Sequence, residues 1–398
     1  GEKMNVPKLR FKEFNDEWIE RKLSELYTFK NGINGDRTLY GKGIKFISVG
    51  DILNNAYITY EKIKGLINID EKSLYENSVE FGDVLFQRSS ETRKEIGMSN
   101  VYLDDKISTF GGFVIRGKKN KDNNNNPMFI NYLLRTQNVR KDIVFRGAGA
   151  QHYNIGQEDL KKVSIMIPSI KEQIKVSNFL SLLDKKIELQ TKKIEDLKLF
   201  KKGLLNLCIK NIETMKVPLK RIIKECSEKS ISNDQYDILS STANGLYLQK
   251  EYFNKQAASE NNIGYKIIKK GQLVLSPQNL WMGNININRD FEYGIVSPSY
   301  KVFDINQNIV NVNYFDYWIK SPRALYEYMI SSEQGASIVR RNLNMDLFFE
   351  IMIEIPSKKE QDLLGNQIKN INKKIELETM VLSKLNELKK GLMQNVFV

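Results

Sequence analysis

The chain has 398 residues, of which 41% are hydrophobic and 27% charged, and its net charge is +13. The length suggests two or three domains of roughly 150 residues, and the apolar content excludes disorder on a large scale. The basic excess favours a polyanionic partner, most commonly nucleic acid. Two cysteines exclude a disulfide framework and favour the cytoplasm. No apolar run suggests a secretion signal or reaches the roughly 20 residues of a membrane span.

The first part of the chain predicts a globular region of short strands and helices. Strands are expected at Lys45–Val49, Val84–Gln87 and Ser164–Ile167, because these runs are rich in β-branched and aromatic residues between turn residues. A helical run covers Phe129–Phe145. The polar, asparagine-rich segment Gly117–Asn126 is expected to be a mobile loop.

A long helix is expected over Lys171–Leu207, which lacks proline and follows Pro168. Its apolar residues repeat at heptad spacing, with polar Gln190 and Lys201 at two positions of the same seam. The apolar seam consists of Leu180, Leu183, Ile187, Ile194, Leu197 and Leu204. One such helix alone is equally compatible with an ordinary amphipathic core helix.

The second part repeats this order of elements. Strands are expected at Gln272–Leu275 and Tyr300–Phe303, a helical run at Tyr314–Ser331, and a second long helix at Lys359–Asn395. The second seam consists of Ile368, Ile371, Ile375, Leu382, Leu385 and Leu392, with polar Glu378 and Lys389 at the equivalent polar positions. Two matched helices favour an antiparallel coiled coil, in which about 38 residues span roughly 57 Å.

An internal repeat with one common offset of 188 residues relates the two parts. The matching segments are Ile167–Gln173 with Ile355–Gln361, Lys185–Leu189 with Lys373–Leu377, and Lys201–Leu204 with Lys389–Leu392. About 18 of 43 aligned positions are identical, far beyond chance for one composition. Upstream, Gly82–Phe86 matches Gly271–Leu275 more weakly. The chain is therefore a tandem of two α+β copies, each a variable globular region followed by a long helix.

Catalytic chemistry finds little support in the residues. His152 is the only histidine, and no Walker A motif occurs, so a histidine-based metal site, a Ser-His-Asp triad and nucleotide hydrolysis are not expected. Two segments suggest a DNA methyltransferase. Phe145–Gly149 spells F-x-G-x-G, but a charged helical segment precedes it where a buried strand is needed. Ser297–Tyr300 resembles a motif that holds a flipped base, but it lacks the second proline and is typical of a strand entrance.

The repeated patterns resemble the specificity subunit of type I restriction–modification systems. They are Gly82–Phe86, Gly149–Ile155 and Ile167–Gln173 in the first copy, and Gly271–Leu275, Gly335–Leu343 and Ile355–Gln361 in the second. The resemblance implies two target recognition domains that each read half of a bipartite DNA target, joined by two helices that act as a ruler. It also implies a partner methyltransferase in two copies, a separate ATP-driven restriction subunit, and no cofactor or metal in this chain.

Within that reading, residues 1–168 and 211–356 are the recognition domains, and residues 169–210 and 357–398 are the spacer helices. Arg or Lys reads guanine, Asn or Gln reads adenine, and cationic or small polar groups contact phosphate. The candidates in the first domain are Arg88, Ser89, Ser90, Arg93, Lys94, Arg146, Gln151, His152, Tyr153 and Asn154. Those in the second are Ser276, Gln278, Asn279, Trp281, Asn284, Arg340, Arg341 and Asn342.

Two other functions stay open from the residues alone. One is a self-sufficient DNA adenine methyltransferase that uses the Phe145–Gly149 loop, and it predicts binding of S-adenosylmethionine. The other is a coiled-coil scaffold that binds DNA without sequence preference.

Overall fold

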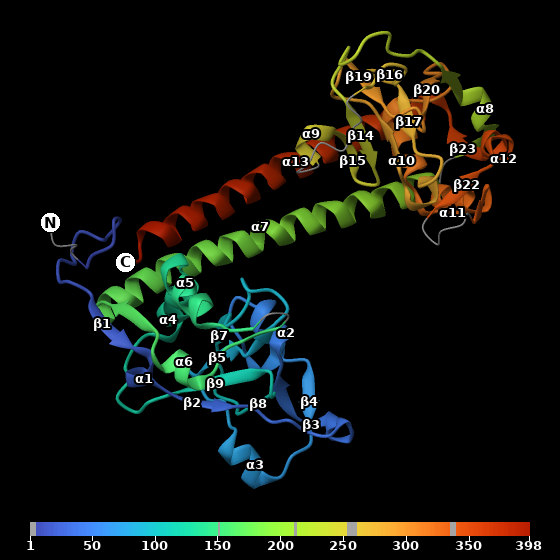
Figure 1. The fold of residues 1–398 in the computed structure, drawn as a ribbon. Coiled ribbons are helices and arrows are strands. Elements are labelled where there is room, and N and C mark those ends of the chain that lie inside the picture. Colours follow the sequence, from blue (N-terminus) through green and yellow to red (C-terminus); the bar gives the residue numbers. More distant parts are fainter. Residues whose placement is uncertain (1–4, 150–151, 211–212, 253–260, 335–339) are drawn as a thin grey trace. The chain divides into compact units, whose positions relative to one another are not determined.

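The chain forms two compact units in a computed structural model that describes residues 5–149, 152–210, 213–252, 261–334 and 340–398. The first unit comprises Gly1–Thr191 and Met380–Val398, and the second comprises Lys192–Thr379. Each unit contains one globular region and a part of each long helix, α7 (Ile170–Lys210) and α13 (Lys358–Asn395) (Figure 1). The α+β class and the two long helices that the sequence predicts are confirmed.

The first unit is built on a four-stranded antiparallel sheet in the order β2-β9-β5-β7. Its strands are β1 (Ile19–Lys22), β2 (Tyr27–Asn31), β3 (Tyr40–Ile47), β4 (Gly65–Ile67), β5 (Val84–Gln87), β6 (Ser89–Ser90), β7 (Ser99–Val101), β8 (Thr109–Phe110), β9 (Val114–Lys119), β10 (Tyr153–Asn154) and β11 (Ser164–Ile167). Its other helices are α1 (Leu23–Leu26), η1 (Arg37–Leu39), α2 (Val49–Leu53), η2 (Tyr60–Lys62), α3 (Glu71–Glu76), α4 (Pro127–Leu134), α5 (Gln137–Arg146) and α6 (Gln157–Lys161).

Strand β5 is buried on both faces, which explains its uninterrupted apolar sequence. Because side chains alternate along a strand, Val84 and Phe86 enter one core while Leu85 enters the other. The first core packs against α4, α5 and the beginning of α7, and also contains Val396 and Phe397 from the end of the chain.

The second unit repeats this plan with the sheet order β13-β20-β17-β18. Its strands are β12 (Thr214–Pro218), β13 (Ile223–Cys226), β14 (Leu239–Thr242), β15 (Gly245–Leu248), β16 (Lys266–Lys269), β17 (Leu273–Leu275), β18 (Ile285–Ile287), β19 (Tyr293–Val296), β20 (Lys301–Ile305), β21 (Ser332–Gln334), β22 (Arg341–Leu343) and β23 (Met352–Pro356). Its other helices are α8 (Leu219–Ile222), α9 (Gln249–Tyr252), η3 (Leu280–Met282), α10 (Val312–Ile319), α11 (Pro322–Ile330) and α12 (Met345–Glu350). Leu273 and Leu275 enter one core and Val274 the other, as in β5.

Each helical run before a long helix is in fact two helices. The first run divides into α4 and α5 at Thr136, and the second into α10 and α11 at Ser321. In the second case the Ser321 side chain accepts a hydrogen bond from the Ala324 N–H, and Pro322 occupies the first turn, so a new helix begins there. The prediction of a single run missed these starts because the apolar pattern continues across them.

The asparagine-rich segment Gly117–Asn126 is a loop only after Lys119, and hydrogen bonds connect it to its surroundings. Residues up to Lys119 belong to β9, and Asn123 is buried and donates to the Leu26 carbonyl at 3.0 Å. The Asn126 N–H donates to Gln173 Oε1 at 2.9 Å. The buried Asn123 side chain therefore fastens this segment to the domain, and the backbone of Asn126 fastens it to α7.

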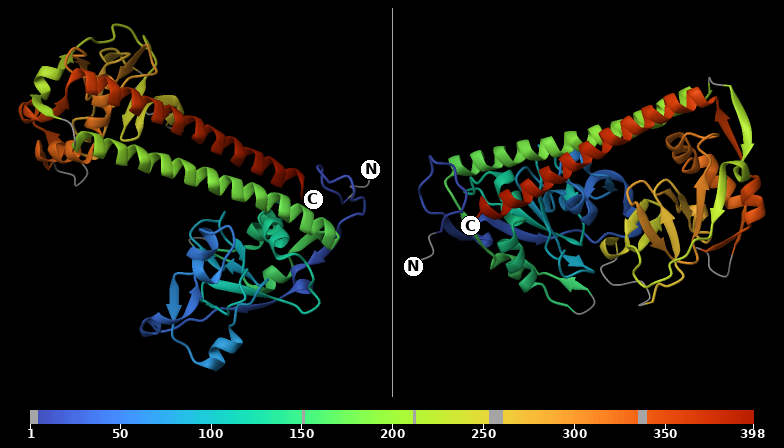
Figure 2. Two further views of the ribbon diagram at one scale, coloured as in Figure 1. Left: turned by 180° about the vertical axis from the view of Figure 1, so that it is seen from behind. Right: turned by 90° about the horizontal axis from the view of Figure 1, so that it is seen from above.

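The burial of the predicted heptad seam differs from that of the rest of both long helices. Each of its twelve apolar positions is buried or half-buried, whereas most of the neighbouring positions are exposed. In the first unit, Asp184 pairs with Lys389 at 2.5 Å; in the second, Lys193 pairs with Glu378 at 2.6 Å and Lys201 donates to Asn372 at 2.7 Å. Within each unit the α7 and α13 segments therefore run antiparallel, and Figure 2 shows them side by side in both views.

We expect Asp184→Ala to lower the free energy of unfolding by about 1–2 kcal/mol. Asp184 accepts from the Tyr132 hydroxyl at 2.7 Å and pairs with Lys389, whose ammonium lies in the seam. Asp196→Ala, on an exposed position of the same helix, is the control and should change stability by less than about 0.5 kcal/mol. Urea unfolding followed by circular dichroism compares the two, and equal losses would contradict this role of Asp184.

Candidate DNA-recognition surfaces

The structure brings the two polar clusters of the first domain together. Strands β6 and β10 pair antiparallel, with Tyr153 opposite Ser90 and Asn154 opposite Ser89. The Ser89 hydroxyl donates to Asn154 Oδ1, and the Ile155 N–H donates to the Arg88 carbonyl at 3.0 Å. Segments that are some 60 residues apart in the sequence thus form one two-stranded ribbon.

The candidate side chains on this ribbon differ in exposure. Arg93, Lys94, His152 and Asn154 are exposed, Ser89 is half-buried, and Arg88 is half-buried and donates to the Gly112 carbonyl at 3.3 Å. Arg146, at the end of α5, is half-buried in an ion pair with Asp142.

Two other candidates are mainly structural, and one cannot be placed. Ser90 is buried and donates to Glu95, and Tyr153 packs against the core. Gln151 lies outside the described residues.

Arg140 of α5 supports this surface and was missed in the sequence. Its Nη2 donates to the carbonyls of Lys94 at 2.9 Å and Ile96 at 2.7 Å, which fastens the turn between β6 and β7 onto α5. Burial lowers the pKa of Arg140 to about 10. In sequence it looks like any helical arginine, and only its two backbone partners distinguish it.

In the second domain a backbone hydrogen bond, and not a strand pair, connects the two clusters. The Arg341 N–H donates to the Gln278 carbonyl at 3.1 Å, and β21 pairs with β22, with Glu333 opposite Asn342. Gln278, Arg340 and Asn342 are exposed. Asn279 and Trp281, at helix η3, are half-buried.

Three candidates of the second domain have internal structural partners. Asn284 is buried, and its amide accepts from the Ser241 hydroxyl at 2.6 Å and donates to the Ser241 carbonyl at 2.9 Å. The Arg341 guanidinium donates to Ser332 and to the Met329 carbonyl at the end of α11. Ser276 is also buried. These side chains could contact a base only by breaking the packing that shapes the surface.

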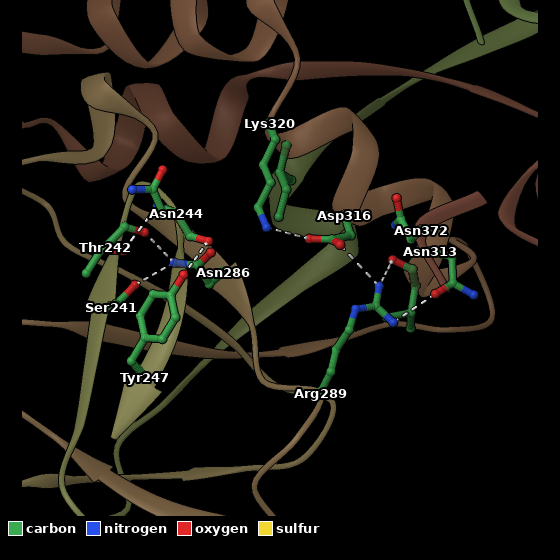
Figure 3. Close-up of polar contacts among 12 residues, drawn as sticks. Ser241, Thr242, Asn244, Tyr247, Asn286, Arg289, Asn313, Asp316, Lys320 and Asn372 are labelled. Atoms are coloured by element: carbon green, nitrogen blue, oxygen red, sulfur yellow. Dashed lines mark hydrogen bonds and ion pairs between the residues drawn. The ribbon is translucent and has the colours of Figure 1, made fainter. Parts of the chain in front are cut away.

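A separate polar cluster lies between the β14–β15 hairpin and α10 (Figure 3). It borders a cavity of about 230 Å³. Asp316 pairs with both Arg289 at 3.4 Å and Lys320 at 3.2 Å, and Asn286 donates to Thr242 at 2.8 Å. We interpret the cluster as structural, because Asp316 pairs with both cations and joins α10 to the loop after β18, while Asn286 of β18 joins that strand to β14.

The Phe145–Gly149 loop lacks the surroundings of a cofactor loop. Helix α5 precedes it, and Ala148 forms an isolated bridge with Asn154. Gly149 has φ +140, and a Cβ there would lie 2.0 Å from the His152 carbonyl oxygen, so the glycine permits this close backbone approach. Among the described residues, no three His, Cys, Asp or Glu side chains are grouped to hold a metal ion.

The described helices also include none that is apolar over a length sufficient to span a bilayer.

Comparisons with known proteins agree with this fold. The family description "Type I restriction modification DNA specificity domain" matches residues 15–199. A protein of Methanocaldococcus jannaschii, named as the MjaX specificity subunit of a type I restriction enzyme, is 22% identical over 417 residues, which cover 98% of this chain and 95% of that protein.

Two solved structures share the fold over almost their whole length. The S subunit of a type I restriction–modification system from M. genitalium has a TM-score of 0.57 and 17% identity, with 99% of each chain covered. A chain solved in work on complex assembly and conformational transition of the type I R-M system has a TM-score of 0.54 and 13% identity, with 96% of this chain and 97% of that chain covered.

These relatives are specificity subunits of type I restriction–modification systems, and the tandem fold of this chain is the same. Residues 15–199 match the family of type I restriction–modification DNA specificity domains, and the whole chain is similar to specificity subunits of these systems, as the repeated motifs predicted. Neither the fold nor these relatives support the alternative of a self-sufficient methyltransferase.

We expect Arg140→Ala to speed amide hydrogen exchange in residues 92–98 by about 5- to 30-fold, since a buried carbonyl without its donor costs about 1–2 kcal/mol. Arg146→Ala is the matched control on the same helix, because it removes only a partly exposed i,i+4 ion pair. Exchange measured by mass spectrometry tests this. Unchanged exchange in the Arg140 variant would mean that the turn is held by other contacts.

Proposed function

We propose that the chain recognises a bipartite duplex DNA target, with one half read by residues 1–168 and the other by residues 211–356. The observation that carries this proposal is that backbone hydrogen bonds connect the two distant polar clusters in each unit, through the β6–β10 pair in the first and through Arg341 and Gln278 in the second. The net charge of +13 suits a phosphate-rich partner.

The side chains proposed to contact DNA are the open members of the two surfaces. In the first domain they are Arg88, Ser89, Arg93, Lys94, Arg146, His152 and Asn154, and in the second Gln278, Asn279, Trp281, Arg340 and Asn342. The guanidinium and amide groups suit base edges, and the exposed cations suit phosphates. Gln151 remains a candidate of the first surface.

The paired helices, residues 169–210 and 357–398, are proposed to set the length of the unread spacer. The seam supports this role, because interlocked apolar positions and ion pairs such as Lys193–Glu378 resist sliding of one helix along the other. The family works with DNA and with other subunits of restriction–modification complexes. We therefore also propose a partner adenine methyltransferase in two copies, a restriction and translocation subunit, and a cytoplasmic location.

Methylome sequencing of a host that expresses this chain with and without a candidate methyltransferase subunit tests the proposal. We expect a new bipartite motif, with methyladenine in both halves, only when both proteins are present. No new motif with any partner would favour the scaffold without sequence preference. Methylation by this chain alone would instead support the alternative that the chain is a self-sufficient methyltransferase.

We expect Arg88→Ala and Arg340→Ala each to weaken binding of the target duplex by roughly 5- to 100-fold, the range of one specific contact. If the arginine contacts a phosphate, its loss should also lower the salt dependence of binding by about one counterion. If it contacts a base, its loss should reduce the preference for that base at one position of the target.

Arg21→Ala and Arg323→Ala are the matched controls, one in each unit. Each arginine lies outside the surfaces and is half-exposed in an ion pair, with Glu25 and Glu354 respectively. Fluorescence anisotropy at physiological salt compares all four variants. Binding by the Arg88 or Arg340 variant that matches its control would remove that residue from the surface.

A further inference from the structure

Phe113 stands beside Arg88 on the first surface, although nothing in the repeat motifs pointed to it. It lies on the turn between β8 and β9, and 68% of the residue is exposed. The Arg88 N–H donates to the Phe113 carbonyl at 2.8 Å, and Arg88 Nη1 donates to the carbonyl of neighbouring Gly112. The Phe113 ring and the Arg88 guanidinium therefore belong to two segments of one surface that are hydrogen-bonded to each other.

The turn that carries Phe113 is held rigidly. The Gly112 N–H donates to the Ile33 carbonyl at 2.9 Å, and the Val114 N–H donates to the Gly111 carbonyl at 2.8 Å. A Cβ on Gly112 would lie 1.6 Å from Asn34 Oδ1, so a side chain there would displace the Asn34 amide from its present position. Packing on the Ile33–Asn34 segment thus fixes the backbone of Phe113, and the ring projects into solvent from a preorganised base.

An exposed phenylalanine is unusual among groups that otherwise form hydrogen bonds. Its neighbours on the surface are Arg88, Ser89 and Asn154, whose heteroatoms suit polar edges of bases or phosphates. A phenyl ring offers no hydrogen-bond donor, so its favourable contact on DNA is with an apolar group. Thymine displays such a group, its C5 methyl, in the major groove.

The shape of the surface also selects the major groove. The β6–β10 pair is a two-stranded ribbon, which the roughly 12 Å wide major groove admits without widening. We propose that Phe113 is a specificity-determining residue that reads the C5 methyl of one thymine in the half-site bound by the first domain. This inference rests on the proposed function, and it identifies one base of the target as a thymine.

The second domain has no aromatic ring at the equivalent position. Phe86 of β5 pairs with Ile115, and the matching Leu275 of β17 pairs with Lys301. Two residues earlier, Phe113 corresponds to Ser299, which is exposed and shares a hydrogen bond with Ser297. The thymine contact is therefore a property of the first half-site alone.

The test uses the full chain in complex with its methyltransferase subunit and the duplex identified from the methylome. Each thymine is replaced singly by uracil, which removes only the methyl group. We expect the uracil substitution to weaken binding by the wild-type complex about fourfold at one position in one half-site. This factor corresponds to the loss of one buried methyl group. Phe113→Ala should weaken binding to the thymine duplex by at least the same factor and bind thymine and uracil equally there. Phe113→Leu should retain part of the preference.

Two other exposed phenylalanines serve as controls. Phe81 precedes β5, at the opposite end of the strand from Arg88, and Phe145 ends α5. Phe81→Ala and Phe145→Ala should both keep the wild-type response to uracil.

Three results would overturn the inference: a target without thymine, a wild-type complex indifferent to every uracil, or a Phe113→Ala complex with the full uracil penalty. Each of these results is compatible with recognition of a bipartite target. Failure of the proposed function would instead be seen in the methylome experiment, which would show no bipartite motif.

Discussion

One buried glutamine at the start of each long helix connects the helix to its domain. Gln173 donates to the Pro168 carbonyl at 2.9 Å and accepts from the Asn126 N–H at 2.9 Å. Asn126 is in turn the N-cap of α4, the first helix of the core. The orientation of the domain on α7 therefore depends on a continuous chain of hydrogen bonds, and breaking such a chain is costly.

The second unit builds the same connection with the equivalent partners. Gln361 donates to the carbonyls of Pro356 and Ile309 and accepts from the N–H of Asn311, the N-cap of α10. This explains why the motif that ends in Gln173 and Gln361 is among the best-matched parts of the repeat. The motif is structural, and it holds each candidate recognition surface at a defined place on its long helix.

Away from this connection, equivalent positions of the two copies are in contact in both units, but their side chains differ in chemical type. The seam contact between Asp184 and Lys389 is an ion pair, whereas the equivalent Asn372 and Lys201 form a hydrogen bond between an amide and a cation. The turn after the central strand is held by Arg140 in the first unit, whereas helix η3 packs on α11 in the second. Such exchanges preserve packing while they free the outward-facing residues to differ, as two half-sites of different sequence require.

The sequence by itself determined the tandem plan, the buried central strands and the seam of the long helices, because these depend on local periodicity and on matches between the copies. Only the tertiary structure decided which polar residues are open. Asn284 and Arg341 look like DNA-reading residues in sequence, yet partners elsewhere in the fold occupy their side chains. Phe113 and Arg140 acquire their roles from neighbours distant along the chain, and no local pattern encodes such long-range pairing.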